Sequence, residues 1–160
     1  VNSRRPEKVY DVNKMILVIE HLIEKLNTQI IFYYSPNEKE FVKTVHKKLN
    51  NNINVFSNIK TDSIRELATL LSNCDMFFGN EGGPRHIAQS LDIPSFAIFS
   101  PSASKKEWLS NACERHQGVE PQDMPLYSHS LSREEKYALI TPEYIIAKIE
   151  EIYNNFVKRG

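Results

Sequence analysis

The stretch that decides the fold is Asp75-Met-Phe-Phe-Gly-Asn-Glu-Gly-Gly-Pro-Arg-His-Ile-Ala-Gln89. Its apolar run, residues 76–78, predicts a short buried strand, and Pro84 is a favoured residue for the first turn of a helix. Three of the five glycines in the chain fall between positions 79 and 83, so conformational freedom is concentrated at this strand-to-helix joint. A helix start presents unpaired N–H groups at the positive end of the helix dipole. The joint is therefore suited to binding a phosphate group.

Strands and helices alternate along the rest of the chain. Apolar runs predict strands at residues 29–34, 53–56, 76–78 and 95–99, and periodicity or capping patterns predict helices at residues 9–26, 37–49, 63–73, 85–91 and 141–157. The strands are apolar throughout, as a sheet covered on both faces requires. We therefore expect an α/β fold with an open parallel sheet and helices on both faces.

Two segments near the end of the chain differ from this alternation. Residues 102–132 mix Pro, Ser, His and isolated aromatic residues, which predicts an irregular excursion over the surface. Thr141-Pro142-Glu143 then combines an N-cap, a proline at the first helical position and an acid in the first turn. The helix at 141–157 is expected to dock back on the domain through its apolar stripe.

The composition indicates one ordinary globular domain over residues 1–160, because the length is too short to expect two. The 20 basic and 20 acidic residues balance, so nothing favours nucleic acid as a partner. Cys74 and Cys113 lack paired spacing, and no histidine has metal-ligand spacing, so we expect neither a disulfide framework nor a metal. No apolar run approaches the roughly 18–20 residues of a membrane span. The chain begins with valine, which indicates a piece of something longer.

Three segments could bind a ligand, and each also has a plainer interpretation. The joint from Glu81 to His86 is either a phosphate site or a simple turn with a helix-start histidine. Glu38, after the strand at 29–34, is placed to accept both hydroxyls of a ribose, or it only complements a helix dipole. Arg4 and Arg5 could pair bidentately with a diphosphate, or they are a solvated charge pair.

Together the three segments predict a nucleoside diphosphate site. In open parallel sheets ligands bind beyond the carboxyl ends of the strands, and all three segments lie at or near such ends. The chain contains no G-x-G-x-x-G and no G-x-x-x-x-G-K-[ST]. A dinucleotide dehydrogenase and a P-loop ATPase are therefore disfavoured.

The block from Leu67 to Pro101 closely resembles the signature of glycosyltransferase family 9, the lipopolysaccharide heptosyltransferases. That family has an apolar strand, Gly-Asn-Asp-Ser/Thr-Gly-Pro-x-His-x-Ala, a Gly-Ile-Pro turn, a second strand, and a proline-rich loop before a tryptophan, here Trp108. The opening Arg4-Arg-Pro-Glu-Lys8 is similar to the family's Lys-Arg-Trp-Pro-x-Glu-Lys without its tryptophan. The segment Ile140-Thr-Pro-Glu-Tyr-Ile145 resembles its final helix start.

The resemblance implies the C-terminal, nucleotide-sugar-binding half of a two-domain GT-B glycosyltransferase, with a Rossmann-like sheet. An N-terminal acceptor domain would then precede Val1, and residues 1–3 would be the tail of the first strand. The implied substrate-binding residues hold the diphosphate (Gly82, Gly83, Pro84, His86, and Arg4 or Arg5), the ribose (Glu38), the surroundings of the base (Thr61) and a sugar hydroxyl (Glu81).

The reaction that the resemblance implies is transfer of heptose from ADP-heptose to a lipopolysaccharide core or similar glycan or glycolipid acceptor. It also implies a cytoplasmic protein, with peripheral attachment to the inner face of a bacterial inner membrane as a further expectation. The nucleotide sugar is a substrate, so no cofactor is expected. No catalytic residue is nominated, because the general base is expected in the other domain. We therefore expect the isolated chain to bind nucleotide weakly and to transfer nothing.

One departure from the family pattern keeps two other classes open. The family's Asp-Ser/Thr is Glu81-Gly82 here, which lengthens the carboxylate and removes a hydroxyl whose hydrogen bond is worth on the order of 1 kcal/mol. The chain could therefore be a catalytically degenerate relative that only binds a nucleotide or a partner. The other open class is an unrelated flavodoxin-like binding domain.

Overall fold

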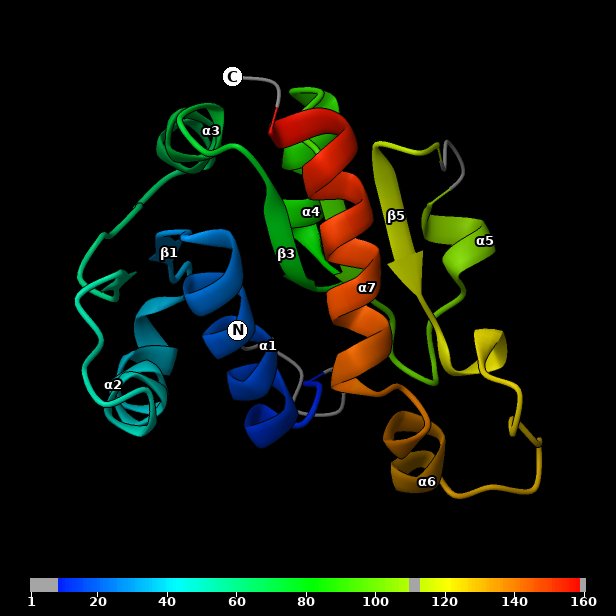
Figure 1. Ribbon diagram of the computed structural model, residues 1–160. Helices are drawn as coiled ribbons and strands as arrows, with labels where there is room; N and C mark the ends of the chain where they lie inside the picture. The colour runs from blue at the N-terminus through cyan, green and yellow to red at the C-terminus, as the bar shows by residue number, and fades with distance from the viewer. Residues whose placement is uncertain (1–8, 110–112, 159–160) are drawn as a thin grey trace.

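The computed structural model describes residues 9–109 and 113–158 and shows strands alternating with helices (Figure 1). The strands are β1 (Ile30–Ile31), β2 (Val55–Phe56), β3 (Phe77–Asn80), β4 (Ser95–Ile98) and β5 (His116–Val119). The α-helices are α1 (Val12–Leu26), α2 (Lys39–Lys48), α3 (Ile64–Ser72), α4 (Gly83–Ser90), α5 (Lys105–Trp108), α6 (Arg133–Ala138) and α7 (Pro142–Ile152). Two short 3-10 turns, η2 (Pro36–Glu38) and η3 (Pro121–Asp123), and a π-helical end, η4 (Tyr153–Val157), complete the elements.

The strands pair in parallel, as predicted, but in two groups. In the described ranges β1 pairs with β2, and β3, β4 and β5 form a separate sheet with β4 in the middle. The register sets Phe77 opposite Ser95 and Ser95 opposite His116. The predicted α/β class with parallel strands flanked by helices is confirmed.

Helices cover both faces of the three-stranded sheet. On one face α1 and α7 lie side by side (Figure 1), and Phe96 and Ile98 of β4 join their core. Ala97 and Phe99 alternate to the other face, where they pack with Leu109. The helices α3 and α4 pack together through a cluster of their own. This alternation along β4 is the period of two that a strand imposes.

Helix starts were predicted with mixed success. Ser63 accepts a hydrogen bond from the Glu66 N–H, and Thr141 from the Tyr144 N–H, so these two N-caps are confirmed. The capping pattern predicted to begin at Asn37 is wrong, because α2 starts without a side-chain cap.

The prediction of an irregular surface segment over residues 102–132 is wrong in part. That range contains α5, η3 and the strand β5, which pairs with β4 along its length. The sequence His116-Gln-Gly-Val119 carries only one apolar residue, so it lacks the signal of a buried strand. The sheet instead accepts it because His116 is buried with a hydrogen-bond partner and Gly118 lies beneath Phe99. The helix predicted at 141–157 is present as α7 and η4, with Ile145, Ile149 and Ile152 buried.

None of the helices in the described part of the chain has both the length and the apolar character needed to cross a bilayer.

Substitution Gly118→Ala tests the position of β5. An added Cβ would lie 2.7 Å from Cε2 of Phe99 and 2.9 Å from the Ala97 carbonyl oxygen, too close for any real contact. We expect the free energy of unfolding in urea to fall by about 1–3 kcal/mol. Gly79→Ala in β3 is the matched control, because its Cβ would meet Phe77 at an ordinary 3.4 Å. Equal stability of Gly118→Ala and the parent chain would contradict the assigned register.

Candidate functional site

The joint between β3 and α4 leaves the start of the helix open. Gly82 is the N-cap of α4, and Gly83 and Pro84 begin the helix without a capping side chain among the described residues. Gly83 is exposed, and a Cβ built on it would meet nothing within 4 Å. Of the first-turn residues, Pro84 has no N–H and the Arg85 N–H donates to the Gly82 carbonyl at 3.2 Å. The exposed Gly83 N–H therefore remains, together with the positive end of the helix dipole. Such an opening can hold a phosphate.

The backbone before this opening is anchored to β4 and to α1. The Glu81 N–H donates to the Ile98 carbonyl at 2.9 Å, which extends the β3–β4 pairing by one residue. The Asn80 side-chain oxygen accepts from the Tyr10 N–H at 3.1 Å, just before α1. The carboxyl end of β3 is thus held from two sides.

Glu81 turns its carboxylate toward β4. It is only 8% exposed, and its Oε1 accepts from the Ser100 hydroxyl at 3.4 Å. The predicted contact of Glu81 with a donor sugar stays a prediction, and in this structure the carboxylate faces the end of the neighbouring strand.

His86 stands exposed in the first turns of α4, next to a buried arginine. Nη2 of Arg85 lies 2.8 Å from Nδ1 of His86, and the rings of His86 and Trp108 meet edge to face with centroids 5.9 Å apart. The pKa of His86 is lowered, first by partial loss of hydration and then by the Arg85 charge, while Glu81 raises it. The lowered pKa favours the neutral imidazole over the imidazolium.

Sequence reasoning missed Arg85. The sequence contains a weak sign that Arg85 is buried, because Arg85 and the apolar Ala88 are three positions apart and so share one face of α4. Both are buried on that face. A charged residue on the apolar face of a helix is an anomaly that points to a specific role.

Glu38 carries an unusual feature for its place after β1. Its Oε2 accepts from both the N–H and the hydroxyl of Ser35 at 2.6 Å. Its Oε1 is buried, with no hydrogen-bond partner in the described structure. A buried carboxylate oxygen without a donor requires an explanation, and a hydroxyl of a bound ribose would supply the donor.

The predicted residues do not all meet. Gly82, Gly83, Pro84 and His86 form one joint, whereas Glu38 and Thr61 lie on the segments that follow β1 and β2. Within the described ranges no hydrogen bond or ion pair connects those two residues to the joint. Tyr33, two residues after β1, does pack against the cluster formed by α3 and α4. Arg4 and Arg5 lie outside the described residues, so their role stays a prediction.

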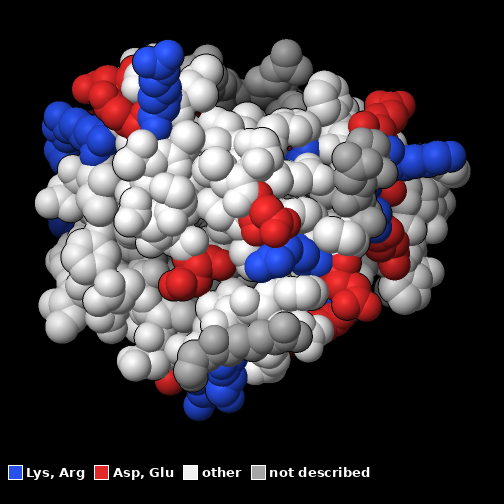
Figure 2. All heavy atoms as spheres, turned by 90° about the horizontal axis from the view of Figure 1, so that it is seen from above, with Lys and Arg blue, Asp and Glu red and all other residues white. Residues whose placement is uncertain are grey.

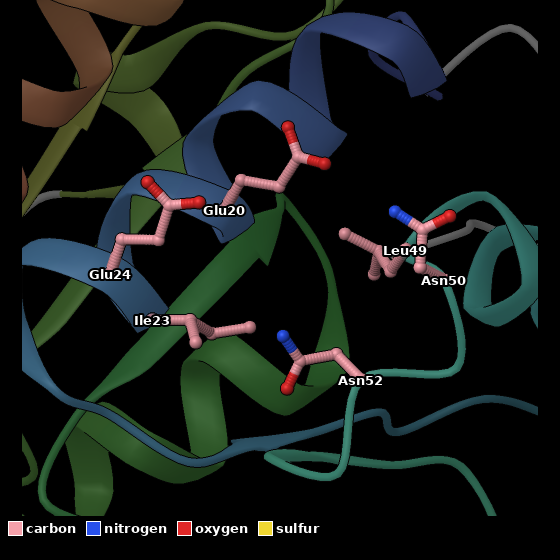
Figure 3. Close-up of a pocket in the computed structure, with 6 residues that line it drawn as sticks. All are labelled: Glu20, Ile23, Glu24, Leu49, Asn50 and Asn52. Atoms are coloured by element: carbon pink, nitrogen blue, oxygen red, sulfur yellow. The ribbon is translucent and has the colours of Figure 1, made fainter.

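Two other features of the molecule are poorer candidates. A hollow of about 160 Å³ lies between α1 and the turn after α2, lined by Glu20, Ile23, Glu24, Leu49, Asn50 and Asn52 (Figure 3). It is smaller than the several hundred Å³ of typical ligand pockets, and none of its lining residues belongs to the β3–α4 joint.

The second feature is a serine–histidine–aspartate row at the amino ends of β4 and β5. The Ser95 hydroxyl lies 3.1 Å from Nδ1 of His116, whose Nε2 lies 3.4 Å from Asp92. Ser95 is 0% exposed, so no substrate can reach its hydroxyl. Burial lowers the pKa of His116, and the row ties two strand ends together.

The face seen in Figure 2 shows no large region of one charge sign, because acidic and basic side chains there are interspersed with uncharged surface. The start of α4 is a local source of positive potential.

The fold is an α/β domain of parallel strands with an open helix start after β3. The family model "Glycosyltransferase family 9 (heptosyltransferase)" matches residues 1–137. The chain belongs to glycosyltransferase family 9.

Known relatives agree with this membership. The lipopolysaccharide heptosyltransferase 1 of Campylobacter coli is 30% identical over 109 residues, which are 65% of this chain and 31% of that protein. The chain thus spans about a third of that relative. The family 9 glycosyltransferase of Veillonella parvula has a TM-score of 0.76 at 19% identity, over 97% of this chain and 45% of that one. The E. coli heptosyltransferase WaaC, solved with ADP-2-deoxy-2-fluoro heptose, has a TM-score of 0.68 at 16% identity, over 94% and 41%.

Gly82→Ala tests how the joint is built. Gly82 has φ 157° and ψ −173°, a conformation that residues with a side chain rarely adopt. We expect urea unfolding to show a loss of about 1–2 kcal/mol. Gly83→Ala is the matched control and should unfold no earlier than the parent chain, since its Cβ meets nothing. Equal losses for both variants would show that the backbone at Gly82 is not special.

Proposed function

We propose that this chain is the donor-binding half of a glycosyltransferase that moves heptose from ADP-heptose to a lipopolysaccharide core or similar glycan. The observation that carries the proposal is the open start of α4, with Gly82, Gly83 and His86 in place, in a chain of family 9. The solved WaaC complex supports the choice of donor, because that related protein holds an ADP-heptose analogue.

The joint would act on the leaving group. Displacement at the anomeric carbon breaks the bond to the β-phosphate, and negative charge then grows on the departing diphosphate. The Gly83 N–H and the His86 side chain would be fixed donors for that charge, and the dipole of α4 would add positive potential. Fixed donors of this kind stabilise a transition state without reorganising during the reaction.

Glu38 would recognise the ribose. Its Oε1 is buried and lacks a donor in the described structure, whereas Ser35 already occupies Oε2. A ribose hydroxyl that donates to Oε1 would remove the cost of this unpaired oxygen, about 1–3 kcal/mol. The site would then prefer a nucleoside diphosphate to inorganic diphosphate.

The acceptor and the general base would belong to the part of the enzyme that this chain does not span. The chain covers 31% of the Campylobacter relative, and none of its described residues is assigned here as the base. We expect this chain alone to bind nucleotide and to transfer no sugar.

A second candidate is a family member that binds a nucleotide without transferring sugar. The observation in its favour is the contact between Glu81 and Ser100, which directs the carboxylate to the protein. Sugar transfer by the full-length protein with ADP-heptose would exclude this candidate, and transfer gained only on Glu81→Asp would favour it.

His86→Ala tests the diphosphate site. Loss of one hydrogen bond to a charged group corresponds to roughly tenfold weaker ADP binding, measured by isothermal titration calorimetry. His129→Ala is the matched control, because His129 is exposed in the loop before α6 and should leave the affinity unchanged. A folded parent chain that shows no heat with millimolar ADP would contradict the proposal.

Glu38→Gln separates ribose recognition from phosphate recognition. The variant should bind ADP roughly tenfold more weakly and pyrophosphate as well as the parent chain, since Glu38 would contact only the ribose. Competition calorimetry with both ligands measures the two affinities. An equal loss for both ligands would place Glu38 outside the ribose site.

A further inference from the structure

Arg85 is the largest fully buried side chain in the described structure, at 0% exposure. Burying a cation is costly unless its donors are paired. Nη1 donates to Gln89 Oε1 at 2.8 Å, and Nη2 donates to the Trp108 carbonyl. The guanidinium carbon also lies 6.0 Å from the centre of the Phe99 ring. Its Nε is buried with no hydrogen-bond partner in the described structure, so the core alone does not account for this charge. The pairing of both Nη atoms indicates that the charge has a role beyond filling the core.

The pairing with His86 decides the state of the imidazole. Arg85 Nη2 lies 2.8 Å from Nδ1 and 3.1 Å from Nε2. A guanidinium has only donors, so the ring nitrogen that pairs with it must carry no proton. Pairing at Nδ1, the shorter contact, leaves the single N–H on Nε2, which also lies within 3.1 Å of the guanidinium. A doubly protonated His86 would have no lone pair for Arg85.

The charges around His86 act in opposite directions. Arg85 and partial loss of hydration lower its pKa, and Glu81 raises it. The Trp108 ring beside it is uncharged. Among the described residues, removing Arg85 would leave Glu81 as the charged group that shifts the pKa of His86, so the imidazole would take up a proton at higher pH.

Arg85 also connects α4 to α5. The start of α5 is anchored elsewhere, because the Lys105 ammonium pairs with Asp123 at 2.6 Å. The end of this four-residue helix is held by the bond from Arg85 to the Trp108 carbonyl. The same guanidinium thus touches both His86 and the segment that carries the ring beside it.

We propose that Arg85 is a positioning residue, which holds His86 as a neutral ring at the start of α4 and fixes Trp108 beside it. The statement that His86 binds a diphosphate rests on the proposed function. The orientation and protonation of His86 do not depend on that function.

Proton NMR titration of the histidine rings tests this directly. The signal of His86 is identified by its absence in His86→Gln. In Arg85→Met we expect the midpoint of the His86 titration to move to higher pH. Arg115→Met is the matched control. Like Arg85, Arg115 has a buried Nε without a hydrogen-bond partner in the described structure, and its charge lowers the pKa of His116. That variant should move the His116 midpoint upward and leave His86 unchanged.

An unchanged His86 midpoint in folded Arg85→Met would overturn the proposal. If circular dichroism shows that Arg85→Met does not fold, Arg85→Lys replaces it, because lysine keeps the charge but cannot bridge two acceptors as a fork. Arg85→Lys should hold the His86 midpoint near that of the parent chain. If neither variant folds, Arg85 serves folding and the positioning role is lost.

Binding of ADP at several pH values gives the functional measurement. Arg85→Met should bind about tenfold more weakly at pH 8 and recover affinity as the pH falls, because His86 then becomes a cation. A loss that is the same at every pH would indicate a purely structural role and overturn the proposal. If the parent chain binds no ADP but the His86 midpoint still moves, the proposed function fails and the positioning role of Arg85 stands.

Discussion

The parallel pairing of β3 with β4 is the constraint on which the site depends. Its last hydrogen bond, from the Glu81 N–H to the Ile98 carbonyl, fixes the residue at which the strand ends. Gly82 must then turn the chain, and α4 must start at Gly83 beside the end of β4. The open helix start, the exposed His86 and the buried Arg85 all follow from this one point of attachment. A shift of register by one residue would move every one of them.

The elements around this joint were predictable because their signals are local. An apolar run, a cluster of glycines and a proline at a helix start specify β3 and α4 without reference to the rest of the chain. The N-caps at Ser63 and Thr141 were predictable for the same reason. The candidate residues Gly82, Gly83, Pro84 and His86 lie together because one continuous segment carries them all.

The failures came where distant contacts decide the structure. The strand β5 lacks an apolar pattern, and its place depends on partners in and just after β4, such as Ser95 and Phe99. The cap expected at Asn37 did not form: η2 precedes α2, Glu38 is the N-cap of α2, and its carboxylate accepts from Ser35 instead. Arg85 was not singled out, because its place on the same helix face as Ala88 is a weak signal until the contact with Trp108 shows that it is buried. Glu38 and Thr61 are far from the joint in sequence. They lie on the segments that follow β1 and β2, which form the two-stranded sheet.

The central claim is that the N–H groups at the start of α4 bind the diphosphate of a nucleotide. Titration of the 15N-labelled chain with ADP, followed by amide NMR, measures this most directly. The account predicts that the largest shifts fall on the amides of Gly82, Gly83, Arg85 and His86, with smaller shifts near Ser35 and Glu38. Shifts confined to the hollow around Glu20 and Asn52, or an unchanged spectrum of the folded chain at millimolar ADP, would contradict it.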